Sequence, residues 1–211
     1  MSDSASARVA VLTRLRNAQQ TARLPAAPSI PPRPALVARS GQECIERFRA
    51  ELGALGVDCF LEHSLADLHR RVSTLIESRQ VLSWDADLLP YGLGSLLRHA
   101  AWGRDSREKQ AQAEIGVTGC DAAIAETGSL AMLSGKGKSR AVSLLPPVHL
   151  AIVRRDDLCF SMAEFFRVHA DRLAAVASCT FITGPSRTAD IELTLTLGVH
   201  GPGKVIVVIG P

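Results

Sequence analysis

The sequence is poor in aromatic residues, which make up 4% of its 211 residues. A platform on which the bases of single-stranded nucleic acid stack needs such side chains, so the composition argues against that class of protein. A marked excess of charge is lacking as well, because 24 Lys and Arg against 21 Asp and Glu leave a net charge of +3. A value this small indicates neither nucleic acid nor an anionic membrane as a partner.

Metal-binding cysteine patterns are missing, since no CxxC motif occurs. Structural zinc and iron–sulfur motifs are therefore absent, and we expect no metal and no cofactor. The five cysteines are scattered, odd in number and mostly in apolar surroundings, which favours free buried thiols in a reducing compartment. They are Cys44, Cys59, Cys120, Cys159 and Cys179.

Long apolar runs are also lacking, and none has the length of a membrane span. The N-terminus has no basic region followed by an apolar stretch, so we expect no signal peptide and a cytoplasmic protein. The length fits one domain, or one domain plus a small appendage. With 46% hydrophobic and 21% charged residues, the composition is that of an ordinary globular protein.

Familiar catalytic fingerprints are missing from the chain. The run Ser134–Ser139 contains Gly-Lys-Ser, but Met132 stands where a Walker motif needs its first glycine. There is no G-x-G-x-x-G of a nicotinamide site, no HExxH and no G-x-S-x-G around Ser129 or Ser186. These absences argue against a P-loop hydrolase, a nicotinamide enzyme and a zincin.

The first 35 residues are predicted to form an arm, and residues 36–211 an α/β domain. Helical spacing of Val9, Leu12 and Leu15 predicts a helix over residues 4–21, with Ser4 or Ser6 as its cap. A proline-rich linker follows over residues 25–34. The arm is either a docked or mobile appendage or a helix that binds a partner.

From residue 40 onward, helical and strand patterns alternate, which predicts a mostly parallel sheet with helices on both faces. Residues 191–197 alternate apolar and polar, and residues 204–209 are continuously apolar, so we expect the last two strands to form a C-terminal β-hairpin. Helices are expected at 41–54, 64–79 (capped by Ser64), 93–102 and 161–176. Strands are expected at 57–61, 81–84, 114–118, 122–125, 130–133, 141–145, 149–153, 180–182, 191–197 and 204–209.

Two polar, glycine-rich segments beside predicted strands, residues 116–129 and 183–190, are the best candidates for a site. Loops at strand ends commonly bind the ligands of α/β proteins. In the first, Glu126 is a candidate base or nucleophile, followed by Thr127 and Gly128. The alternative is that Glu126 accepts backbone hydrogen bonds and orders the turn.

The second segment places Arg187 between the hydroxyls of Ser186 and Thr188, after the Gly184-Pro185 turn. Hydroxyls, an arginine and backbone N–H groups make an oxyanion or phosphate cradle, in which Asp190 orients Arg187 or acts as a base. Turn chemistry alone is the alternative. We expect the two segments to face each other and to form one anion-binding site centred on Glu126 and Arg187.

Three further features are weaker candidates for ligand binding. The basic loop with Lys138 and Arg140 either closes over an anionic ligand or forms a solvated hairpin tip. His149 and His200 lie in turns that flank strands, where a lone histidine is more often structural.

Four phrases occur in sequence along the second half of the chain: Gly116-Val-Thr-Gly-Cys-Asp-Ala-Ala-Ile-Ala-Glu-Thr-Gly-Ser129, Ser143-Leu-Leu-Pro-Pro-Val-His149, Thr183-Gly-Pro-Ser-Arg-Thr-Ala-Asp-Ile-Glu192 and Leu197-Gly-Val-His-Gly-Pro202. Their order and spacing resemble the LUD domain of the lactate-utilisation protein C family. The resemblance is close over residues 110–210 and looser over 36–109. Cys120 stands where small residues such as Ala are usual.

The resemblance implies a fold like that of sugar-phosphate isomerases and CoA transferases. It also implies a role in oxidising L-lactate to pyruvate, beside partner proteins that carry iron–sulfur clusters, with this chain as the cluster-free member. The family supplies no established catalytic residues. The alternative is a stand-alone enzyme or binder for a phosphorylated or acyl-CoA metabolite.

Overall fold

A computed structural model describes residues 3–22, 39–97, 99–188 and 196–211. The chain divides into two units, Met1–Ala35 and Leu36–Pro211. The first contains the helix α1 (Asp3–Thr21), as its apolar spacing predicts, although the helix begins before both expected cap residues. Within the described ranges, no helix is both long and apolar enough to cross a membrane.

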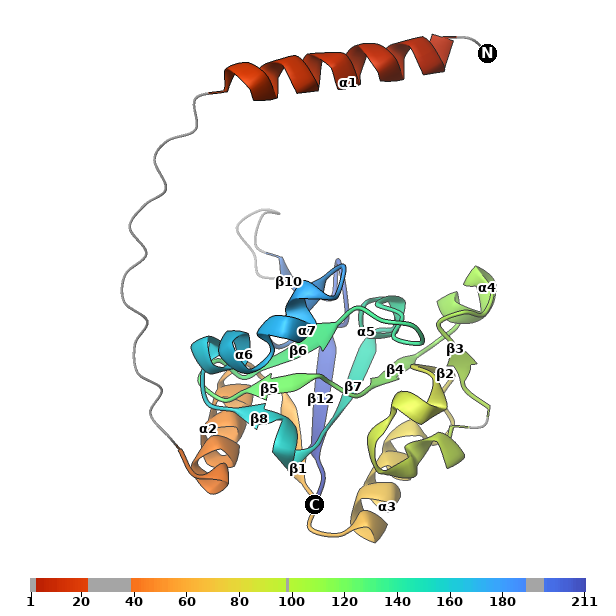
Figure 1. The fold of residues 1–211 in the computed structure, drawn as a ribbon. Helices are drawn as coiled ribbons and strands as arrows, with labels where there is room; N and C mark the ends of the chain where they lie inside the picture. Colours follow the sequence, from red (N-terminus) through yellow and green to blue (C-terminus); the bar gives the residue numbers. More distant parts are fainter. Residues whose placement is uncertain (1–2, 23–38, 98, 189–195) are drawn as a thin grey trace. The chain divides into compact units, whose positions relative to one another are not determined.

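The second unit is built around a six-stranded sheet in the order β1-β12-β7-β4-β2-β3, in which every neighbouring pair is parallel. Figure 1 shows β12 inside this main sheet, between β1 and β7. The predicted parallel α/β class is therefore confirmed. The strands are β1 (Asp58–Leu61), β2 (Val81–Ser83), β3 (Ala101–Trp102), β4 (Ile115–Thr118), β7 (Val148–Val153) and β12 (Lys204–Ile209).

A second sheet of four strands packs against the first and has the order β8-β5-β6-β9. Its β5–β6 and β6–β9 pairs are antiparallel, whereas β5 and β8 run parallel. Its strands are β5 (Ala122–Ile124), β6 (Ser129–Leu133), β8 (Leu158–Cys159) and β9 (Cys179–Ile182). A two-stranded antiparallel ribbon of β10 (Arg187–Thr188) and β11 (Thr196–Leu197) completes the strands in the described part of the chain.

The elements form layers, because apolar side chains on each face of the main sheet need a cover. One face packs against α3 (Leu65–Ile76), with Leu68 and Val72 fully buried, and against the 3-10 helix Pro90–Ser95. The other face packs against α2 (Gly41–Ala54) and the small sheet. The outer side of the small sheet is covered by α6 (Met162–Val168), through Phe165.

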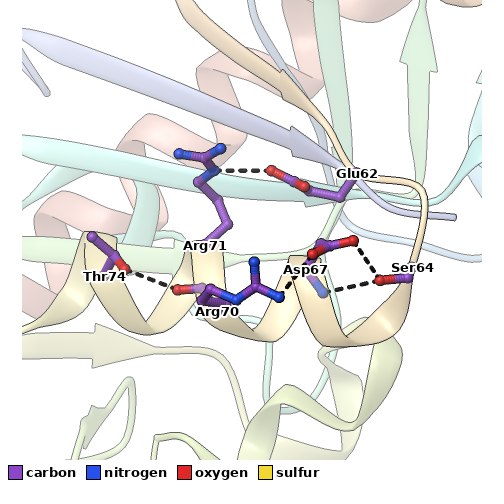
Figure 2. Close-up of polar contacts among 6 residues, drawn as sticks. All are labelled: Glu62, Ser64, Asp67, Arg70, Arg71 and Thr74. Carbon is purple, nitrogen blue, oxygen red and sulfur yellow. Dashed lines mark hydrogen bonds and ion pairs between the residues drawn. The ribbon is translucent and has the colours of Figure 1, made fainter.

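Helices α2 and α3 begin where their sequences predict. Ser40 and Glu43 form a capping box at α2, and Ser64 accepts a hydrogen bond from the Asp67 amide at α3. Figure 2 shows this cap of α3, together with the ion pair Arg70–Asp67 within the helix and the ion pair between Arg71 and Glu62, which follows β1. The first pair is exposed and adds little to stability, whereas the Glu62 side chain is only 12% exposed.

Expectations about elements are wrong in three respects. The C-terminal β-hairpin is not formed, because β12 pairs in parallel with β1 and β7 on its two edges, while β11 pairs with β10. Residues 191–195 of the expected hairpin strand lie outside the described ranges. The apolar run 141–145 forms a helix, α5 (Ala141–Leu144), and not a strand.

The third error concerns the predicted helices 93–102 and 161–176. The first is replaced by the 3-10 helix Pro90–Ser95 and the strand β3, and the second is interrupted at His169 between α6 and α7 (Ala170–Ala174). The remaining elements are the helix α4 (Arg107–Ala111) and the 3-10 helices Ala86–Leu88 and Arg155–Asp157.

Candidate functional site

The two glycine-rich segments lie side by side, at the same end of two neighbouring strands of the small sheet. The strands β6 and β9 pair so that Leu130 is opposite Ile182. Ser129 Oγ lies 2.8 Å from Thr127 Oγ1 and 2.7 Å from Thr183 Oγ1. The three hydroxyls therefore form a hydrogen-bonded chain that joins the segments.

The charged residues of the two segments have different partners. Glu126 Oε1 accepts a hydrogen bond of 2.7 Å from the Met162 amide at the start of α6. The Arg187 guanidinium donates to the carbonyl oxygen of Leu55, just after α2. Each side chain thus bonds to the backbone of a different helix end, and the catalytic role of Glu126 stays a prediction.

Two other expected residues of these segments, Gly128 and Thr188, are described and carry no charge. A Cβ atom on Gly128 would lie 3.1 Å from the Leu55 side chain, so this turn is pressed against the end of α2. Thr188 lies in the ribbon strand β10. Asp190 lies outside the residues that the structure describes.

The basic loop between β6 and α5 is tied down by a buried carboxylate. Asp121 is 6% exposed and accepts hydrogen bonds from the Leu133 amide, from Lys138 Nζ at 2.7 Å and from the Arg172 guanidinium. Lys138 Nζ also lies 5.1 Å from the centre of the Trp84 ring. The Lys138 ammonium is therefore engaged within the fold, unlike the exposed Arg140.

A pocket of about 300 Å³ lies between the amino ends of β7 and β12 and the strand β9. Its floor is made by His149 and Val205, which are paired across β7 and β12. Ser186 and His200 line it as well, so three of the expected binding residues share one cavity. Thr183 also lines the pocket. The chain of hydrogen-bonded hydroxyls Thr127–Ser129–Thr183 therefore ends at the pocket wall.

His149 is the distinctive group of this pocket, which we call the His149 pocket. The imidazole is fully buried, and its Nε2 lies 2.9 Å from Thr118 Oγ1. Its Nδ1 is buried without a hydrogen-bond partner in the described chain. An unpaired buried polar atom costs free energy, so an orphaned nitrogen beside a cavity indicates a place for a ligand atom.

Burial lowers the pKa of His149 to about 4, because the apolar surroundings disfavour the imidazolium. The ring is therefore neutral at pH 7 and presents either one donor or one acceptor at Nδ1, according to its tautomer. A neutral imidazole can bind the hydroxyl or carbonyl oxygen of a ligand.

A smaller cavity of about 10 Å³ adjoins the His149 pocket and shares Ser143, Leu144 and Thr180 with it. Lys138 and Arg140 line this smaller cavity. Since Lys138 is paired with Asp121, Arg140 is the cation next to the pocket that has no ion-pair partner among the described residues.

The sequence does not single out Thr118 or Ser143, which support the site from a strand end and a short helix. Thr118 is a buried hydroxyl in an apolar strand, and Ser143 is buried in α5 beside the pocket. In the register of β4 and β7, Gly116 is opposite His149 and Thr118 lies two residues further along β4, so their contact becomes visible only when the register is known.

Among the described residues, no group of three His, Cys, Asp or Glu side chains could hold a metal ion. All five cysteines are free. Burial raises the pKa of Cys59 to about 11 and that of Cys159 to about 12, which keeps both as thiols at neutral pH. A thiol is a poor nucleophile and a poor metal ligand compared with a thiolate.

Comparison with known proteins places these features in a family. The model of the LUD domain matches residues 45–209. A lactate utilization protein C from Geobacillus sp. (strain WCH70) is 30% identical over 191 residues, which cover 81% of this chain and 79% of that protein. Another from Halalkalibacterium halodurans is 38% identical over 150 residues, covering 64% of this chain and 65% of that protein.

The fold also matches a solved structure. A DUF162 family protein from Deinococcus radiodurans superimposes with a TM-score of 0.64 and 21% identity, over 82% of this chain and 100% of that chain. At this identity the likeness concerns the fold alone. The family match spans both sheets and every residue of the His149 pocket, and this chain belongs to the LUD domain family that includes the lactate utilization protein C relatives.

Proposed function

We propose that this chain works in lactate utilisation, as the cluster-free subunit of a system that oxidises L-lactate to pyruvate. The observation that carries the proposal is the similarity to proteins named lactate utilization protein C, at 30% identity over 81% of this chain. We further propose that its partners carry the iron–sulfur clusters, since its own five cysteines are free and have no CxxC spacing. Free thiols also support a reducing, cytoplasmic location.

The His149 pocket is the proposed binding site for a small 2-hydroxy or 2-oxo acid. Such an acid needs a neutral partner for its hydroxyl or carbonyl oxygen and polar or cationic partners for its carboxylate. His149 Nδ1 supplies the first at the floor, while Ser186, His200 and the nearby Arg140 supply the second. A volume of about 300 Å³ lies at the lower end of the range for ligand pockets, which suits a small metabolite.

Growth tests the pathway. Deletion of the gene in the source organism should abolish growth on L-lactate and leave growth on pyruvate unchanged, and the wild-type gene should restore it. Unimpaired growth of the deletion strain on L-lactate would refute the proposal. A His149→Gln gene should restore growth poorly, whereas a Ser73→Ala gene, altered on the exposed side of α3, should restore it fully.

Purification tests the partners. The tagged full-length chain should bring down proteins that contain iron and acid-labile sulfide, in a fixed ratio to the chain. Recovery of the chain without iron under anaerobic, low-salt conditions would contradict the assignment of cluster-bearing partners while leaving the pathway test intact.

Binding tests the pocket. Saturation-transfer NMR with L-lactate and with pyruvate should show contact with the wild-type protein that is reduced by His149→Gln and by Ser186→Ala. The matched control is again Ser73→Ala, which removes an exposed hydroxyl from α3, a helix that contributes no residue to the lining of the pocket. Equal signals from all four proteins would exclude the pocket as the binding site.

A further inference from the structure

A second cavity of about 310 Å³ lies at the carboxyl ends of β2 and β3. Asp85 follows β2, Gly103 and Arg104 follow β3, and the loop Gly135–Gly137 with Ser139 forms the opposite wall. None of these residues lines the His149 pocket. We call this cavity the Arg104 pocket.

The place of the Arg104 pocket in the sheet is one at which α/β proteins bind ligands. The chain runs from β2 outward to the edge strand β3 and then returns to β4 on the other side of β2. The direction of strand order therefore reverses around β2, and the carboxyl ends of strands at such a reversal leave a crevice for a ligand.

The charges of the Arg104 pocket favour an anion. Lys136 and Arg104 bring two cations, and Asp85 brings one carboxylate, whose Oδ2 lies 3.4 Å from Arg104 NH1. Lys136 forms no ion pair in the part of the chain that the structure describes, whereas its neighbour Lys138 is paired with Asp121. Asp85 occupies one side of the Arg104 guanidinium and leaves its other N–H groups for a ligand.

The loop that carries Lys136 is held in one shape. The Lys138 amide bonds to the Gly135 carbonyl, and Gly137 has a φ of +77°, a value that favours glycine. The Asp85 amide bonds to the Gly137 carbonyl at 3.1 Å, which ties the turn to the end of β2. Two contacts thus fix the turn before any ligand arrives.

The turn also has spare donors. The backbone N–H groups of Lys136 and Gly137 have no acceptor among the described residues. Consecutive free N–H groups in a turn of this kind form an anion-binding concavity. Together with two cations they match the several oxygens of a phosphate group better than the two oxygens of a carboxylate.

We propose that the Arg104 pocket binds the phosphate group of a small phosphorylated molecule. Lys136, Arg104 and the turn N–H groups hold the phosphate, and Asp85 orients Arg104. The pocket has room for an organic portion beside the phosphate, because its volume is about 310 Å³. The proposal is independent of the lactate role and rests on residues outside the His149 pocket.

Calorimetric titration with inorganic phosphate and with glycerol 3-phosphate, at constant ionic strength, tests the proposal on the full-length protein. Both should bind saturably, and Lys136→Gln and Arg104→Gln should each weaken binding about tenfold, the loss of one charge-assisted contact. The matched controls are Lys109→Gln, which removes an exposed lysine of α4, and Arg140→Gln, which removes the cation beside the other pocket.

Tighter binding of glycerol 3-phosphate than of inorganic phosphate identifies a phosphorylated metabolite as the ligand, and equal binding identifies free phosphate. Either result supports phosphate recognition if the two pocket variants lose it and the controls keep it. Absence of saturable binding overturns the proposal. An equal loss of binding in Lys109→Gln also overturns it, because it indicates a nonspecific effect of charge. A loss of binding confined to Arg140→Gln overturns it as well, because it indicates that the anion binds beside the His149 pocket.

Discussion

The side chains of Thr118 and His149 meet between neighbouring parallel strands, with Thr118 Oγ1 2.9 Å from His149 Nε2. Both side chains are fully buried, so this hydrogen bond fixes the plane of the imidazole. With Nε2 engaged, the only free ring nitrogen is Nδ1, and that atom is the one without a partner. The pair therefore determines what the pocket offers to a ligand.

The pKa of His149 makes stability depend on pH in a defined window. The native pKa of about 4 lies below the ordinary 6.5, so between these values the unfolded chain binds a proton that the native protein excludes. The contribution of His149 to the free energy of unfolding is fully present above pH 6.5, and it decreases as the pH falls from 6.5 toward 4. From pH 7 to pH 5 we expect this residue alone to remove about 2 kcal/mol.

Urea unfolding of the wild type and of His149→Gln at pH 7 and at pH 5 measures this contribution. The variant has no group that titrates at this position, so its loss between the two pH values should be smaller by about 2 kcal/mol. An identical pH dependence in both proteins would mean that the native imidazole is able to take up a proton.

Asp121 should be the most costly carboxylate to neutralise in the described chain. Asp121→Asn removes the negative charge and replaces one acceptor oxygen by an NH2 donor, which then faces either the Leu133 amide or the two cations Lys138 and Arg172. We expect a loss of about 2 kcal/mol, since both cations retain some solvent contact. Asp87→Asn alters an exposed carboxylate and should change the free energy of unfolding by less than about 0.5 kcal/mol. Urea unfolding distinguishes the two, and similar values for both variants would refute the role of Asp121.

Gly116 and Gly53 should respond to alanine with opposite signs. A Cβ atom on Gly116 would lie 1.8 Å from the Val142 carbonyl oxygen, so β4 and α5 would have to separate, at a cost of about 3 kcal/mol. A Cβ atom on Gly53 meets nothing within 4 Å, and Gly53 lies in α2, so alanine there should add about 0.5–1 kcal/mol. Thermal unfolding should show a lower Tm for the first variant and a higher one for the second.

Glu126 can be tested for a structural or a chemical role. Glu126→Gln keeps an oxygen acceptor for the Met162 amide, whereas Glu126→Ala leaves that N–H unpaired. From the contact alone, we expect the alanine variant to lose about 1 kcal/mol more stability than the glutamine variant, and the glutamine variant to support growth on lactate. A stable Glu126→Gln protein that fails in the growth test would instead favour the role as a base.

Elements with a local signal could be predicted from the sequence. The helix α2 has its predicted bounds, and Ser64 caps α3, because capping residues and apolar spacing act within one or two turns of the chain. The split of the helix at His169 and the helical run Ala141–Leu144 were missed. A short apolar run has the same composition in a buried helix and in a buried strand, so its packing decides between them.

Strand neighbours and buried partners could not be read from the sequence. The apolar run of β12 predicts burial, but nothing in it tells whether the neighbours are β1 and β7 or the preceding polar-alternating segment. The sequence brought His149, Ser186 and His200 forward as separate candidates. Their meeting in one pocket depends on the register between β7 and β12 and on the approach of β9.

The position of β12 between the edge strand β1 and the strand β7 has a consequence for how the protein is made. Residues 204–209 pair with β7 and with β1, whose residues 58–61 leave the ribosome far earlier. Until β12 emerges, β1 lacks its neighbour in the main sheet, and the second hydrophobic cluster lacks Val205, Val207 and Ile209. Closure of the sheet is thus a late, long-range event in synthesis, and until then β1 and β7 keep unpaired edges, which are prone to pair with other chains.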